Sequence, residues 1–126
     1  MKTILIVTML SLFSVTCHAG ALNYRCTIKS VMETNTNGVL TKAPSNKLKT
    51  FSVDRNDGSV TGGPFDNSEY GDIQVVNHGD SGSPFQVFMN DGFKSDYLQV
   101  MEYAKPDKKP FIGIDYLGTV YSGICE

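Results

Sequence analysis

The residues with the clearest potential for chemistry lie close together near the middle of the chain. Ser81 could act as a nucleophile, and His78, three residues earlier, is the histidine that could accept its proton. Together, a serine, a histidine and an acid catalyse acyl transfer, as in ester or peptide hydrolysis. That chemistry requires the base to reach the serine oxygen while a separate acid holds the base.

The string Gly79–Pro84 resembles the sequence around the nucleophilic serine of trypsin-like proteases. The resemblance implies Ser81 as the nucleophile and the backbone near Gly79 as the oxyanion hole. In those proteases the histidine and the aspartate lie far upstream of the serine, in a longer chain with two β-barrels. Here His78, three residues before Ser81, is the only histidine apart from His18. We therefore predict a tight polar loop with no catalytic residue, and we interpret the string as coincidental.

The same segment has the composition of a rigid loop tip. Asn77–Pro84 combines glycine, proline and short polar side chains, and it lies between predicted strands at Ile73–Asn77 and Phe85–Met89. We expect this loop to project from a rigid scaffold and to contact a protein partner, such as the cleft of a hydrolase. The predicted contact residues are His78, Asp80, Ser81, Ser83 and Phe85.

The N-terminus has the features of a secretion signal. Lys2 precedes the apolar run Ile4–Phe13, which is too short for a permanent span of roughly 20 residues. Small residues follow, and they predict cleavage after Ala19 or after Ala21. A lipid anchor on Cys17 is the alternative, since the preceding residues resemble the lipobox of bacterial lipoproteins, although its usual Leu and its Gly or Ala are missing.

This segment therefore predicts a signal peptide over residues 1–19, or 1–21 with the later site, and one β domain over residues 20–126. The protein is expected to be secreted or periplasmic, with no stable membrane span. Outside the signal, Cys26 and Cys125 bracket almost the whole chain and predict a disulfide. Closing a loop of about 100 residues contributes on the order of 4–5 kcal/mol in the chain-entropy model.

Alternation of apolar and polar residues predicts strands through most of the domain. It is clearest over residues 22–29, where Cys26 falls on the apolar face. Ser95–Ala104 also fits a helix, but its Tyr and Val content favours a strand. Turns rich in Asn, Asp and Gly separate the runs. The further predicted strands are Leu48–Val53, Ser59–Thr61, Ile73–Asn77, Phe85–Met89, Tyr97–Tyr103, Phe111–Tyr116 and Thr119–Ile124.

These features predict an all-β fold, a small antiparallel up-and-down β-barrel of about eight strands. A disulfide between the first and last strands would close such a sheet and remove both of its edges. A β-sandwich with the same bridge is the alternative. Numerous phenylalanine and tyrosine side chains favour a packed interior over a ligand cavity.

Charge and composition exclude several functions. The chain carries 11 Lys and Arg against 13 Asp and Glu, and removal of Lys2 with the signal leaves 10 against 13. This mildly acidic domain has no basic patch for nucleic acid. Asp66, Glu69 and Asp72 share a loop but lack the spacing of an EF-hand, so we predict a solvated loop, no metal site and no cofactor.

A second resemblance concerns function. Tyr24 and Cys26 near the start of the domain, together with Cys125 at its end, resemble the small periplasmic inhibitors of c-type lysozyme. That resemblance implies a loop offered to an enzyme cleft, and Ser81–Phe85 matches its Ser-Gly and aromatic pattern. The chain lacks tryptophan and the later Lys-Gly segment of that family. We expect a non-enzymatic exported binding or inhibitor protein; a small-ligand carrier and, less favoured, a hydrolase are the alternatives.

Overall fold

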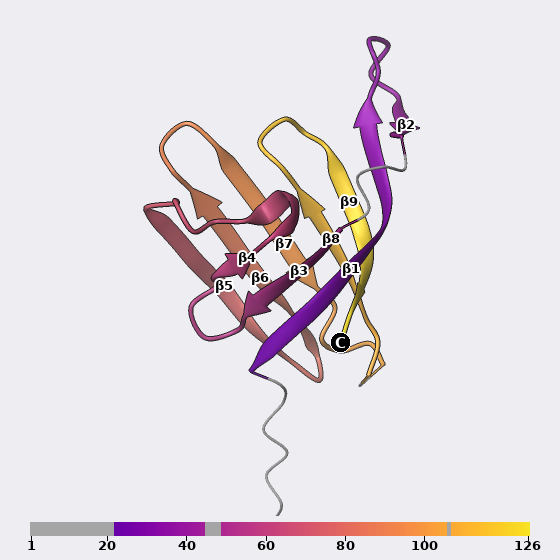
Figure 1. Ribbon diagram of the computed structural model, residues 1–126. Helices are drawn as coiled ribbons and strands as arrows, with labels where there is room; N and C mark the ends of the chain where they lie inside the picture. Colours follow the sequence, from indigo (N-terminus) through magenta and orange to yellow (C-terminus); the bar gives the residue numbers. More distant parts are fainter. Residues whose placement is uncertain (1–21, 45–48, 106) are drawn as a thin grey trace, which may run out of the picture.

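The described part of the chain forms one antiparallel sheet that curls around a core (Figure 1). The computed structural model describes residues 22–44, 49–105 and 107–126. The predicted signal peptide and its cleavage sites lie outside these ranges. The strands are β1 (Asn23–Thr34), β2 (Leu40–Lys42), β3 (Thr50–Asp54), β4 (Val60–Thr61), β5 (Asp72–Asp80), β6 (Ser83–Asn90), β7 (Ser95–Val100), β8 (Lys109–Ile114) and β9 (Val120–Cys125), with a 3-10 turn η2 (Gly63–Phe65) after β4.

Alternation along the strands sets which side chains reach the core. In β1, Tyr24, Cys26 and Ile28 are buried and the residues between them are more exposed, as the sequence predicts. Every predicted strand is present, and Leu48, the first residue predicted for the strand Leu48–Val53, lies outside the described residues. The segment Ser95–Ala104 is a strand up to Val100 and continues as a turn, which confirms the strand over the helix. The short β2 was not expected, because all three of its residues are exposed and show no alternation.

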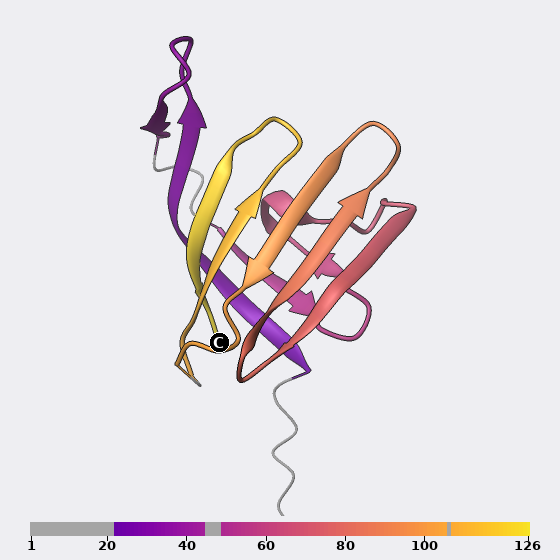
Figure 2. The same ribbon diagram turned by 180° about the vertical axis from the view of Figure 1, so that it is seen from behind.

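The sheet runs in the order β4-β3-β1-β9-β8-β7-β6-β5, and β2 pairs with the upper part of β1. The first and last strands therefore lie side by side (Figure 2). Cys26 pairs directly with Cys125, and the two form the predicted disulfide across 99 residues of sequence. The fold is a single curled sheet in the shape of a half-barrel, and the sandwich alternative is excluded.

The sheet does not close completely, so the expected loss of both edges is only partly achieved. Its two ends are β4 and β5, and the segment between them, including η2, separates them. Asn67 takes the place of a neighbouring strand for β4. The side-chain oxygen of Asn67 accepts a hydrogen bond from the Val60 N–H at 2.8 Å. Its backbone N–H donates to the Val60 carbonyl at 3.1 Å, and its side-chain amide donates to the Gly58 carbonyl at 3.0 Å. These bonds satisfy an edge that would otherwise expose backbone groups.

Aromatic side chains fill the interior. Phe51 meets Phe65 and Phe111 edge-on, with ring centroids 5.7 and 5.2 Å apart, and Phe65 meets Tyr121 at 5.2 Å. Such T-shaped pairs add to the free energy gained from burial. Two glycines make room for this packing: a Cβ on Gly113 would lie 2.3 Å from the Phe65 ring, and one on Gly123 would lie 2.8 Å from the Phe111 ring.

Candidate functional site

The segment predicted as a binding loop is the β5–β6 hairpin, and its loop is shorter than expected. Pairing continues through His78 with Phe85 and Asp80 with Ser83, so only Ser81 and Gly82 form the tip. Asp80 closes the turn by accepting from the Gly82 N–H at 2.7 Å. The ends of these two strands could not be recognised from the sequence, because their residues are polar and pair through their backbones and not through apolar side chains.

The five predicted contact residues do not share one environment. His78, Asp80 and Ser81 are exposed, and Ser83 is half-buried. Phe85 is fully buried and packs edge-on against Tyr24, with ring centroids 5.6 Å apart. Phe85 is thus a core residue that anchors the hairpin, and the exposed surface of the tip consists of His78, Asp80 and Ser81.

The same residues are not arranged as a catalytic triad. The Nδ1 atom of His78 lies 3.0 Å from the carbonyl oxygen of Arg55, and an Asp80 oxygen is occupied by the Gly82 N–H. In the described part of the chain, neither side chain is hydrogen-bonded to the Ser81 hydroxyl. Nucleophilic activation of a serine needs that first contact and a second one that orients the base.

Arg55, in the turn after β3, holds the hairpin from across the open side of the sheet. Its Nη2 donates to the carbonyls of His78 at 2.9 Å and Gly79 at 3.3 Å, and its guanidinium lies 5.2 Å from the centre of the Tyr24 ring. Arg55 therefore caps backbone groups at the free edge of β5. The tip is fixed from outside the hairpin as well as by its own turn.

Glu102 completes this cluster. Its Oε1 lies 3.4 Å from Arg55 Nη1 and 3.3 Å from Lys109 Nζ, and the Tyr24 hydroxyl donates to its Oε2. Burial, followed by the contact with Glu102, raises the pKa of Tyr24 above its ordinary value. We name Tyr24, Arg55, Glu102 and Lys109 the hairpin clamp. Sequence reasoning missed it because its members are far apart in the chain and have no characteristic spacing.

We expect the clamp to contribute measurably to stability. We expect Tyr24→Phe to lower the free energy of unfolding by about 1–2 kcal/mol, because it removes a hydrogen bond to a charged group and leaves the ring in place. Chemical denaturation at neutral pH measures the effect. Tyr97→Phe, which removes a hydroxyl bonded only to neutral Gln side chains, is the matched control and should cost less. Equal losses of stability in the two variants would mean that the charge of Glu102 does not strengthen its hydrogen bond with Tyr24.

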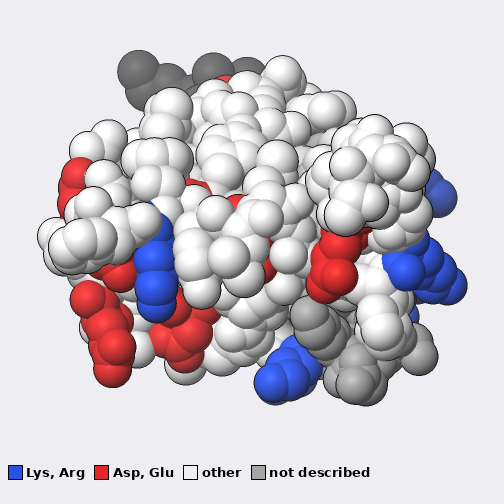
Figure 3. All heavy atoms as spheres, turned by 90° about the horizontal axis from the view of Figure 1, so that it is seen from above, with Lys and Arg blue, Asp and Glu red and all other residues white. Residues whose placement is uncertain are grey.

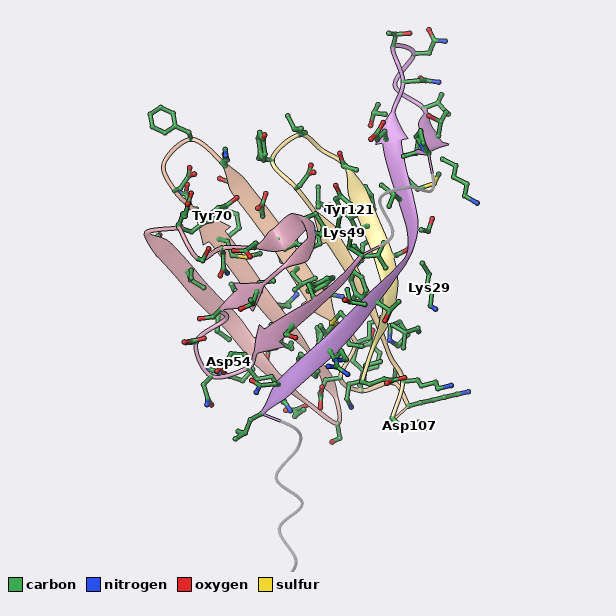
Figure 4. The ribbon with its side chains drawn as sticks, viewed as in Figure 1. Lys29, Lys49, Asp54, Tyr70, Asp107 and Tyr121 are labelled. Atoms are coloured by element: carbon green, nitrogen blue, oxygen red, sulfur yellow. A yellow bond between two sulfur atoms is a disulfide. The ribbon has the colours of Figure 1, made fainter. Side chains whose placement is uncertain are left out.

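At the opposite end of the sheet, Asp96 joins two loops. This carboxylate is 1 % exposed; it accepts from the Tyr70 hydroxyl at 2.7 Å and from the Tyr116 N–H at 2.8 Å. Figure 4 labels Tyr70 in the segment before β5. Burial raises the pKa of Asp96 above its ordinary value, against the opposing effect of the hydrogen bond from Tyr70. The carboxylate positions the β8–β9 turn.

This pKa shift predicts a pH dependence. Because the folded chain binds the Asp96 proton more tightly than the unfolded chain, the contribution of Asp96 to the free energy of unfolding should fall as the pH rises above about 4. Asp96→Asn cannot lose a proton. The stability of this variant minus that of the wild type should therefore become more positive between about pH 3 and pH 7. Denaturation curves of both proteins across this pH range test the prediction. A stability difference that stays constant or falls with rising pH would contradict a raised pKa for Asp96.

The acidic loop before β5 is organised by its own hydrogen bonds. Asp66 accepts from the hydroxyl of Ser68 at 2.7 Å and from the Gly62 N–H at 2.8 Å, and these hydrogen bonds lower the pKa of Asp66. Asp72 accepts from the Gln74 amide at 3.1 Å. In the described ranges, no group of three or more His, Cys, Asp or Glu side chains is placed to hold a metal ion. Within the same ranges, no helix is long and apolar enough to cross a membrane.

Comparison with known proteins adds no family to this description. Neither the family models nor the characterised proteins nor the solved structures compared with the chain give a match. The function of the protein is therefore inferred from the geometry of its described residues.

Proposed function

We propose that this protein is an exported, non-enzymatic binding or inhibitor protein whose β5–β6 tip contacts a protein partner. One observation carries the proposal: the exposed side chains of His78, Asp80 and Ser81 stand on a backbone that is fixed on both sides. The turn is closed by Asp80, and the strand before it is held by Arg55. Binding through such a surface orders little chain, so little conformational entropy opposes it.

The hydrolase alternative has less support in the geometry. Its proposed nucleophile, Ser81, would need the imidazole of His78, which is directed toward the Arg55 carbonyl. A serine hydrolase would react with a fluorophosphonate probe at Ser81. We expect no labelling of Ser81 by this probe.

The carrier alternative would need a cavity inside the sheet. The core positions along β1, β3, β6 and β8 are instead filled by packed side chains. A hollow of about 620 Å³ lies at Thr27 and Lys29 of β1 and Thr50 of β3, and it is open to solvent. This supports a binding protein that uses its surface over one that encloses a ligand.

The resemblance to inhibitors of c-type lysozyme suggests the first partner to try. We expect the protein without residues 1–19 to inhibit a c-type lysozyme, and Ser81→Arg to weaken this inhibition at least tenfold, since a bulky cation at the tip prevents close approach. Thr36→Arg, at the exposed tip of the β1–β2 hairpin, is the matched control and should inhibit as the wild type does. Equal inhibition by both variants would place the contact elsewhere, and no inhibition by the wild type would exclude lysozyme as the partner.

A further inference from the structure

The outer face of β6, β7 and β8 carries no charged side chain. In these strands the residues between the buried ones face outward, as Gln86 and Phe88 do in β6. The charged residues of the three strands are Asp96, which is buried, and Lys109, which contacts Glu102. Seen from above, charged side chains lie mainly at the two sides and in the lower part of the picture, and the upper part, on the side of these strands, is almost all uncharged (Figure 3). A partner that covers this face removes no charge from water.

An apolar row crosses this face. Phe88 lies opposite Tyr97, and Tyr97 lies opposite Ile114, which is 40 % exposed. Beyond β6, the bulge of β5 turns Val76 outward, and its side chain is 64 % exposed. Where water covers the second face of an antiparallel sheet, the outward positions are usually polar. Packing of the core does not account for these apolar residues, because the core lies on the other face.

Gln86, Tyr97 and Gln99 form a rigid polar cluster beside the apolar row. Gln86 Nε2 donates to the Tyr97 hydroxyl at 2.9 Å and to Gln99 Oε1 at 3.0 Å, and the Tyr97 hydroxyl donates to the same Gln99 oxygen at 2.9 Å. These bonds use both N–H groups of the Gln86 amide and the oxygen of Gln99. Within the described part of the chain, the Gln86 oxygen and the Gln99 amide nitrogen have no protein partner. The cluster therefore presents a fixed acceptor and a fixed donor.

This donor and this acceptor make the face self-complementary. They lie on neighbouring strands, because Gln86 is directly opposite Gln99. A twofold axis along the strands, between β6 and β7, brings the Gln99 amide of one copy to the Gln86 oxygen of a second copy. The reverse contact forms at the same time, as in any interface that uses the same patch twice. Each copy thus satisfies the groups that the other leaves free.

The same axis brings apolar side chains together. Phe88 of one copy lies over Tyr97 of the second, because the two residues are opposite each other on β6 and β7. Val76, in the β5 bulge, and Ile112, in β8, flank the two amides on either side, so they also meet across the axis. Four strands about 4.8 Å apart and about 20 Å long give roughly 400 Å² of sheet on each copy. This area suits a weak, reversible dimer.

We propose that this outer face binds the same face of a second copy of the protein. We name it the neutral face and define it by Val76, Gln86, Phe88, Tyr97, Gln99 and Ile112. The whole chain has a formal net charge of −2, so two copies meet with least repulsion where neither carries a charge. Because the axis runs along the strands, the dimer carries its two β5–β6 tips at the same end. The neutral face does not include the exposed residues of the tip, and dimerisation does not depend on the proposed function.

Sedimentation equilibrium of the protein without residues 1–19, which lie outside the described ranges, measures this association. We expect the average mass of the wild type to rise with concentration toward twice that of the monomer. Val76→Glu and Ile112→Lys should each raise the dissociation constant of the dimer at least tenfold, because each buries an unpaired charge. An equimolar mixture of the two variants should recover a dissociation constant within about threefold of the wild type, since the new carboxylate then meets the new ammonium group.

Val39→Glu is the matched control, because Val39 is 56 % exposed in the β1–β2 hairpin and lies outside the neutral face. It should dimerise as the wild type does. Val76 is exposed in the single chain, so Val76→Glu tests the face even if Ile112→Lys does not fold.

A wild type that stays monomeric up to about 1 mM would overturn the proposal. Equal weakening by Val39→Glu, or a mixture of folded variants that does not recover the dimer, would overturn it as well. A monomeric wild type that binds phosphatidylcholine vesicles, with Val76→Glu abolishing the binding, would assign the neutral face to a lipid surface instead.

Discussion

Replacing both Cys26 and Cys125 by serine is expected to lower the free energy of unfolding by about 4–5 kcal/mol, from the loop-closure entropy of the unfolded chain. The two residues are 99 positions apart, so the bridge closes nearly the whole domain into one loop. In the native sheet β1 and β9 already pair along their length. The expected loss therefore arises mainly in the unfolded chain, and the folded structure should change little.

Urea or guanidinium denaturation of the oxidised protein and the double variant measures this loss. The wild type under a strong reductant should match the variant, which separates the effect of the bridge from that of the serine side chains. A difference below about 1 kcal/mol would contradict the account and would indicate a denatured chain that is already compact.

Phe65→Ala is expected to cost about 3–5 kcal/mol, because it leaves a cavity where a fully buried ring stood. Phe65 comes from η2, outside the strands, and contacts Phe51 and Tyr121. Its ring also fills the space over Gly113. Thermal or chemical unfolding gives the loss, and Phe93→Ala, at a ring that is 99 % exposed, is the control that should leave stability nearly unchanged.

The contact between Gly113 and the Phe65 ring allows a double-variant test of this prediction. Gly113→Ala alone should destabilise the protein by about 1–3 kcal/mol, since the added Cβ overlaps the Phe65 ring. In the double variant Phe65→Ala with Gly113→Ala, the methyl group occupies part of the cavity. The total loss should then be smaller than the two single losses together, and strict additivity would show that the two residues are not in contact.

Most of the fold could be predicted from the sequence, because the information is local. Alternation such as that of Tyr24, Cys26 and Ile28 identifies a half-buried strand, and the two cysteines identify which strands meet. The open side of the sheet could not be predicted in this way. It depends on Asn67, a polar residue whose role as a substitute strand is set by three hydrogen bonds to residues seven to nine positions earlier.

The candidate site was less predictable than the fold. The hairpin that carries Ser81 was located correctly, but periodicity could not show that Phe85 turns inward or that Asp80 continues a strand. The hairpin clamp joins Arg55 of one turn to Glu102 of another, and such pairs become visible only when the sheet brings them together. The exposure of Phe93 and Leu117 could not be predicted for the same reason, because it is a property of the fold and not of their neighbours in sequence.

Site-specific photo-crosslinking tests the proposed function most directly. A photoreactive amino acid would replace Ser81 at the β5–β6 tip or, as the matched control, Ser68 in the exposed loop before β5, in the full chain produced in its own cells. We predict a discrete adduct with another protein from position 81, absent from position 68 and reduced by an excess of unlabelled wild-type protein. No adduct from position 81, or the same adducts from both positions, would contradict the claim that this tip is the contact surface.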